Sequence, residues 1–273
     1  MIAFAANSVL GRMGLVEGGI GAGSFVMIRL ISGGLVLALI AGIRPSLRAG
    51  SWAGGWALFL YAALFSYAYL ALPAGSGALI LFAMVQITMV SAGLRNGERL
   101  GALQWGGMAA AVLALIWLLS PGIDTPPLWA AGLMAIAGIS WGIYSLIGQG
   151  ASGADSDPIL RSAGNFLKAV LIALPLLAIA IPSEGTPHLY GVMLAVISGA
   201  ITSGLGYAIW YTALRSLEAT KAGIAQLTVP AIAALGGILF LGEPLSARFV
   251  FASLLILAGV GIATLTQPHS KPD

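Results

Sequence analysis

The sequence is a succession of apolar runs, each about long enough to cross a membrane, separated by short breaks that carry Gly, Pro or charge. A helix needs about 20 apolar residues to span the ~30 Å hydrocarbon core of a bilayer. Of the 273 residues, 59% are hydrophobic and 8% are charged, whereas soluble domains have about 25% charged residues. The chain is therefore predicted to be an all-α integral membrane protein without a large soluble domain.

The apolar runs predict ten transmembrane helices. The predicted spans cover residues 1–15, 22–43, 52–72, 75–94, 101–120, 128–148, 158–181, 190–214, 219–241 and 247–266. The first run is short for a bilayer, which suggests a truncated helix. It also lacks the basic start of a cleavable signal peptide.

The charged residues predict how these spans are oriented, because short cytoplasmic loops are enriched in Lys and Arg. If the N-terminus is inside, Arg248 alone falls in an outer loop. The cytoplasmic loops and tail then hold Arg44, Arg48, Arg95, Arg99, Arg161, Arg215, Lys221 and Lys271. Both termini are therefore expected in the cytoplasm, with the protein in the inner or plasma membrane. This topology accounts for the net charge of +3 without nucleic acid, whose binding requires a basic stripe.

A short motif occurs twice and predicts an internal repeat. Leu94, Gly97, Glu98, Leu100 and Ala102 reappear 145 residues later as Leu239, Gly242, Glu243, Leu245 and Ala247. Each copy joins the fourth and fifth spans of a half, and five helices per half place the second copy upside down, as in many secondary transporters. The predicted domains are a first repeat (1–120), a linker (121–127), a second repeat (128–266) and a cytoplasmic tail (267–273).

Further motifs resemble EamA-type members of the drug/metabolite transporter superfamily. They are FAANSVLGR (4–12), FVMIRL (25–30), AGSGALILFAMVQITM (74–89), the paired GE-x-L motifs, and SGLGYAIWYTAL (203–214) with QLTVPAIAALGG (226–237). The resemblance covers essentially the whole chain and implies two five-helix EamA repeats around a central cavity, which export or exchange small metabolites. Arg12, Arg29, Glu98, Pro230 and Glu243 are expected to be structural or motif residues.

Charged residues within spans are candidates for solute contact, because they are expensive in hydrocarbon. Lys168 lies ten residues into its span, ~15 Å deep at 1.5 Å per residue, and is expected to face the cavity and favour solutes with an anionic group. The alternative is a lysine bonded to helix carbonyls or bent toward the cytoplasm. Arg12 and Arg29 lie nearer the outer ends of their spans, where snorkelling or pairing with Glu17 explains them.

Amide and aromatic side chains within the spans are further candidates for lining the cavity. Amides donate and accept hydrogen bonds at once, while aromatic rings supply apolar walls and hydroxyl groups. The candidates are Asn7, Tyr61, Tyr67, Gln86, Trp141, Tyr144, Asn165, Tyr207 and Gln226. Hydrogen bonding between helices and core packing are the alternative interpretations for each of them.

These features favour a secondary transporter for small polar or amphipathic metabolites, amino-acid-like solutes among them, that works by alternating access. A flippase for lipids or lipid precursors and a passive channel are the alternatives. The chain has no cysteine and its histidines, His188 and His269, lie in a loop and the tail, so we expect no enzyme, no metal site and no cofactor. Its expected partners are a small solute and the lipid bilayer. Protons are a candidate coupling ion, although every carboxylate falls at a span end or in a loop.

Overall fold

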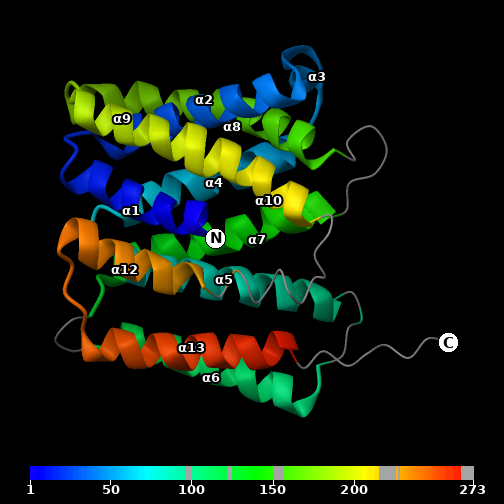
Figure 1. Ribbon diagram of the computed structural model, residues 1–273, viewed down its shortest axis with the longest axis vertical. Helices are drawn as coiled ribbons and strands as arrows, with labels where there is room; N and C mark the ends of the chain where they lie inside the picture. Colours follow the sequence, from blue (N-terminus) through cyan, green and yellow to red (C-terminus); the bar gives the residue numbers. More distant parts are fainter. Residues whose placement is uncertain are drawn as a thin grey trace.

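The computed structural model describes residues 1–95, 97, 100–121, 125–149, 157–214, 226 and 228–265. These residues form an all-helical bundle whose helices run roughly side by side (Figure 1). The first half of the chain forms α1 (Ile2–Val16), α2 (Ala22–Ala41), α3 (Ile43–Arg48), α4 (Trp52–Ala68), α5 (Ala74–Arg95) and α6 (Ala102–Leu119). The second half forms α7 (Leu128–Gln149), α8 (Pro158–Glu184), α9 (Leu189–Ile197), the π-helix η2 (Ser198–Leu205), α10 (Gly206–Leu214), α12 (Val229–Leu241) and α13 (Ala247–Leu265).

Within the described residues, six segments are long and apolar enough to cross a membrane. They are residues 22–41, 74–95, 102–119, 128–148, 158–180 and 189–210. The apolar helices α1, α12 and α13 are shorter or have shorter apolar stretches. The prediction of an all-α membrane protein is therefore confirmed for this part of the chain.

The structure differs from the predicted spans in three places. The third span was expected to reach residue 72, but α4 ends at Ala68 and a turn leads into Pro73. In a continued helix the Pro73 ring would clash with the carbonyl of Tyr69, four residues earlier. The short helix α3 was not predicted. The eighth span is not a uniform α-helix, since the π-helix η2 lies between α9 and α10. Most of the first ten residues of the predicted ninth span lie outside the described residues.

The two halves of the chain pack against each other along most of the bundle. Helix α2 packs on α8, α5 on α12 and α6 on α13, while α7 contacts α4 and α5, and α1 contacts α9 and α12. The α6–α13 pair forms one end of the stack, at the bottom of Figure 1. Its outer surface is apolar: Leu113 of α6 is 65% exposed and Leu254 of α13 is 61% exposed. Such a surface suits contact with lipid.

Glycines permit the close approach of α2 to the second half of the chain. A Cβ atom on Gly199 of η2 would overlap the hydroxyl of Ser32 and the carbonyl of Arg29. A Cβ atom on Gly33 would lie 2.8 Å from the ring of Phe166 on α8. Small residues let helix backbones approach closely in membranes. They bring the π-helix directly against the middle of α2.

Candidate functional site

Polar side chains from three helices of the first half meet in the interior of the bundle. Asn7 of α1, Arg29 of α2 and Tyr61 of α4 each lie more than one helical turn from both ends of their helix. The Tyr61 hydroxyl accepts hydrogen bonds from Arg29 Nη2 at 2.9 Å and from Asn7 Nδ2 at 3.3 Å. All three side chains are buried. We call this set, together with Trp141 and Tyr207, the central cluster.

Hydroxyl groups of the π-helix η2, in the second half of the chain, form hydrogen bonds to the central cluster. Ser198 and Thr202 donate to Asn7 Oδ1 at 2.6 and 3.2 Å, and Ser203 accepts from Arg29 Nε at 3.3 Å. π-helical turns inside α-helices are frequent at functional sites. These three residues were not among the candidates predicted from the sequence. The repeated Ser-Gly pairs at 198–199 and 203–204 were the available signal.

From the sequence, Arg29 was expected to snorkel toward the surface or to pair with Glu17. In the structure it is buried, and neither expectation holds. Only 2% of the residue is exposed, and its guanidinium carbon lies 4.8 Å from the Phe65 ring centroid and 5.2 Å from that of Tyr61. Cation–π contacts of this kind stabilise a buried charge in part. Its Nη1 atom is buried and has no hydrogen-bond partner among the described residues.

Aromatic rings cover the central cluster on the side of α7 and α10. The Trp141 ring lies 4.8 Å from that of Tyr61 and 5.1 Å from that of Tyr207, and it stacks on Tyr144 at 5.4 Å. Tyr144 also donates a hydrogen bond to Ser162 on α8. Four of the aromatic residues predicted as lining candidates are therefore in contact with one another. Tyr67 lies half-buried elsewhere on α4.

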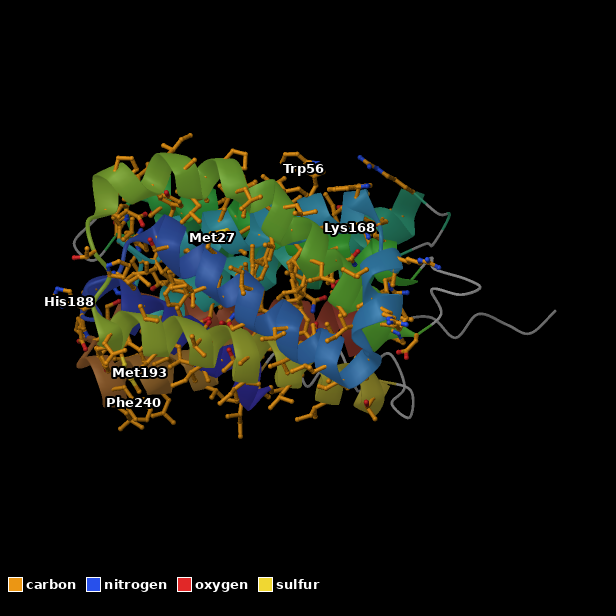
Figure 2. The ribbon with its side chains drawn as sticks, turned by 90° about the horizontal axis from the view of Figure 1, so that it is seen from above. Met27, Trp56, Lys168, His188, Met193 and Phe240 are labelled. Carbon is orange, nitrogen blue, oxygen red and sulfur yellow. The ribbon has the colours of Figure 1, made fainter. Side chains whose placement is uncertain are left out.

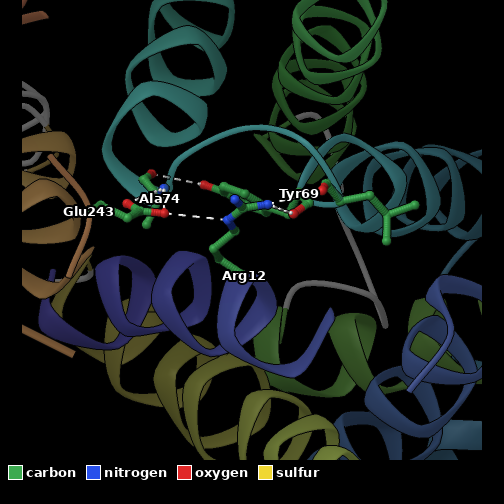
Figure 3. Close-up of polar contacts among 5 residues, drawn as sticks. Arg12, Tyr69, Ala74 and Glu243 are labelled. Atoms are coloured by element: carbon green, nitrogen blue, oxygen red, sulfur yellow. Dashed lines mark hydrogen bonds and ion pairs between the residues drawn. The ribbon is translucent and has the colours of Figure 1, made fainter. Parts of the chain in front are cut away.

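An ion pair lies at the end of the bundle that contains the α12–α13 connection. Arg12 Nε lies 3.4 Å from Glu243 Oε1, and Arg12 Nη1 donates to the carbonyl oxygens of Tyr69 and Leu70 at 2.9 and 3.0 Å. Both Glu243 oxygens accept from the Ala74 amide, at 3.1 and 2.8 Å (Figure 3). Arg12 was expected to snorkel or to pair with Glu17. Its partner is instead Glu243, which only the tertiary fold brings near.

Glu243 and Glu184 have similar roles at this end of the bundle. Glu184, the last residue of α8, accepts from the amides of Gly23 and Ser24 at 2.7 and 3.0 Å. Glu243 does the same for Ala74, the first residue of α5. A carboxylate at a helix N-terminus satisfies free amides and interacts favourably with the helix dipole. Two helices of the first half are thus capped by carboxylates of the second half.

Burial raises the pKa of the Glu243 carboxyl above its ordinary value of 4.5. The Ala74 amide and Arg12 act in the opposite direction, but the effect of burial is larger. Glu243 also borders a cavity of about 470 Å³. The cavity is lined by Ala71, Pro73, Gly75, Ser76, residues 125–127 and 244–246, and parts of α12 and α13. The cavity contains the hydroxyls of Ser76, Thr125 and Ser246. This carboxylate therefore sits beside a hollow of mixed polar and apolar lining at the predicted outer face.

Lys168 has a partner away from the central cluster. Its ammonium donates to the carbonyl oxygen of Ala49, in the connection between α3 and α4, at 2.6 Å. Figure 2 shows Lys168 toward the opposite end of the bundle from His188. The described contacts favour the interpretation of a carbonyl-bonded lysine. Asn165 is also engaged there, since its Oδ1 accepts from the Ser51 amide at 2.9 Å.

Two other predicted lining residues, Gln86 and Gln226, meet the predicted motif residue Pro230 at a separate, much smaller hollow. Gln86, Gln226 and Pro230 border a space of about 10 Å³ between α5, α12 and α13, which is close to the room needed by one water molecule. This hollow is too small for a metabolite. Glu98, which has the same place as Glu243 in the other copy of the GE-x-L motif, lies outside the described residues.

The fold, with its long apolar helices and buried polar cluster, is that of a multi-pass helical membrane protein. The sequence profile of the EamA-like transporter family matches residues 128–265. An uncharacterized protein of Pseudomonas aeruginosa is 47% identical over 265 residues, which are 96% of this chain and 91% of that protein. The chain belongs to the EamA-like transporter family, and it is a transporter rather than an enzyme.

Two more distant relatives have names that state a function. A probable amino-acid metabolite efflux pump of Salmonella typhimurium is 25% identical over 213 residues, 74% of this chain and 71% of the pump. The threonine/homoserine exporter RhtA of Escherichia coli K12 is 32% identical over 164 residues, 59% of this chain and 55% of the exporter. A protein of known crystal structure is 19% identical, with a TM-score of 0.65 and 97% of both chains covered. That structure shares the fold.

Proposed function

We propose that this protein exports or exchanges small amino-acid-like metabolites by alternating access, with the central cluster as its binding site. The observation that carries the proposal is the convergence of Asn7, Arg29 and Tyr61 with the hydroxyls of η2 in the interior of the bundle. Ligand sites combine apolar walls with a few placed polar groups. The names of the two distant exporters support amino-acid-like cargo.

The helix pairing supports a transporter of two inverted repeats. If the repeats are residues 1–120 and 128–266, then α2 and α8, α5 and α12, and α6 and α13 are counterparts, and each packs on its counterpart. The contacts of α7 with α4 and α5 are matched by those of α1 with α9 and α12. Rocking of one repeat against the other would expose the central cluster to each side in turn.

The ion pair of Arg12 with Glu243 supports a gate at the outer face. It joins α1 of the first repeat to the α12–α13 connection of the second. With the central cluster buried, this arrangement corresponds to a state closed at that face. The charge distribution of the loops supports the accompanying topology, in which both termini are cytoplasmic.

Counterflow in proteoliposomes tests this proposal. Vesicles loaded with unlabelled threonine, homoserine or other amino acids should transiently accumulate the same labelled solute above its external concentration, because a carrier exchanges solutes whereas a channel does not. Amines, sugars and a fluorescent phospholipid complete the panel. The Ser253→Ala protein, altered in the distant helix α13, serves as the control and should match the wild type. Movement of the phospholipid without exchange of any amino acid would support the flippase alternative.

A further inference from the structure

We propose that Arg29 is the binding residue for the carboxylate of the transported solute. The inference rests on the proposed function and makes it more specific: solutes with a free carboxylate should bind, and their neutral analogues should not. The inference rests on one buried cation that has no counter-ion among the described residues and whose Nη1 atom has no hydrogen-bond partner there.

The charge of Arg29 is not neutralised by any described residue. A guanidinium remains protonated in proteins, and this one is 2% exposed. The ion pair that the described residues form is that of Arg12 with Glu243. Arg29 is held instead by neutral groups, namely the hydroxyls of Tyr61 and Ser203 and two aromatic faces. A buried ion without a counter-ion destabilises the protein, so an incoming anion would be bound favourably.

The donors of Arg29 are arranged to receive such an anion. Nε and Nη2 are engaged, whereas Nη1 has no acceptor among the described residues. The Tyr61 hydroxyl accepts from both Arg29 and Asn7, so its own hydrogen points away from them and is available as a second donor. A planar guanidinium fork matches the geometry of a carboxylate. Nη1 and Tyr61 together therefore offer a carboxylate one charged and one neutral donor.

A purely structural role accounts poorly for this arrangement. Buried polar groups that only support a fold nearly always have hydrogen-bond partners. Snorkelling is excluded, since Arg29 lies mid-helix and is buried. Lys168, another cation within a long span, donates to the carbonyl oxygen of Ala49, away from the central cluster. Arg29 is distinguished by a fully buried guanidinium nitrogen, Nη1, that has no hydrogen-bond partner among the described residues.

Thermal unfolding of the purified protein without solute gives the first test. Arg29→Met replaces the cation by a side chain of similar length and is expected to leave the melting temperature unchanged or raise it, since it removes an uncompensated charge. Arg29→Lys keeps the charge and should not stabilise the protein. Ser253→Ala is the matched control, because Ser253 Oγ is also buried without a partner but carries no charge. A clear fall in melting temperature for Arg29→Met alone would make Arg29 a structural residue and overturn the proposal.

Ligand-induced thermal shifts give the second test. L-threonine and L-homoserine are compared with L-threonine amide and L-homoserine amide, in which a neutral carboxamide replaces the carboxylate. We expect the amides to bind the wild type at least about tenfold more weakly, as loss of one charge-assisted hydrogen bond implies. The Arg29→Met protein should bind each acid and its amide equally.

The outcomes separate the two proposals. Equal binding of acids and amides by the wild type would overturn the role of Arg29 and leave amino-acid-like cargo in place. Failure of every acid and amide to bind, together with absence of counterflow, would contradict the proposed function itself. The melting temperature of solute-free Arg29→Met protein still decides in that case whether Arg29 is a structural residue.

Discussion

Arg12 Nε lies 3.4 Å from Glu243 Oε1, although the two residues are 231 positions apart in the chain. The pair joins α1 to the connection between α12 and α13, and Glu243 also caps the first amide of α5. Three segments from both halves therefore meet at one carboxylate. The exposed fractions of the two side chains, 19% and 14%, place the pair between a surface ion pair and a buried one.

Removing Arg12 should destabilise the closed arrangement. Arg12→Gln leaves the Glu243 carboxylate half-buried without its cation, and we expect a loss of about 1–3 kcal/mol in unfolding free energy at neutral pH, between surface and buried pairs. The double variant Arg12→Gln with Glu243→Gln should recover much of this loss, because no unpaired charge remains. Denaturation of the wild type, the single variants Arg12→Gln and Glu243→Gln, and the double variant measures the coupling. Strictly additive effects would show that the pair contributes nothing.

The stability of the protein should depend on pH through Glu243. Burial raises the pKa of this carboxyl, so the folded state holds the proton more tightly than the unfolded state does. The stabilisation is complete below the ordinary value of 4.5 and is lost as the pH rises through the raised folded value. Wild-type melting temperature should therefore fall relative to that of Glu243→Gln across this interval. Glu17→Gln, which changes an exposed outer carboxylate, is the control and should follow the wild type.

Lys168 is expected to contribute to stability rather than to solute selection. Lys168→Met removes the hydrogen bond to the Ala49 carbonyl and should lower the unfolding free energy by about 1–3 kcal/mol, as for other hydrogen bonds to charged groups. Lys168→Arg should restore part of it. The preference for carboxylate solutes should be the same in all three proteins. If Lys168→Met had wild-type stability but no longer distinguished acids from amides, Lys168 rather than Arg29 would be the residue that binds the carboxylate.

Cysteine labelling can test the membrane topology, since the native chain has no cysteine. Leu245 and Leu47 are 55% and 65% exposed, in the α12–α13 connection and in α3. A membrane-impermeant thiol reagent added outside intact cells should label Leu245→Cys and spare Leu47→Cys until the membrane is permeabilised. The reverse pattern would invert the proposed orientation, and equal labelling would contradict the assignment of these loops to opposite faces.

The sequence by itself determined the class of structure. Apolar runs bounded by Gly, Pro and charge predicted the helices, and the limits of α2, α6 and α7 agree with the predicted spans to within two residues. The physical reason is that a backbone inside a bilayer must form its hydrogen bonds internally, and an apolar run of that length does so as a helix. The position of Tyr61, Trp141 and Tyr207 within spans also made them reasonable candidates.

Only the tertiary structure decided which polar residues meet. Lys168 and Arg29 look alike in the sequence, as cations inside apolar runs, yet Lys168 reaches the carbonyl of Ala49 and Arg29 faces Tyr61 and Ser203. The difference depends on how each helix is rotated and how near its neighbour lies. Those quantities are set by contacts between distant segments, such as Gly199 of η2 against the backbone of α2, and local composition does not contain them.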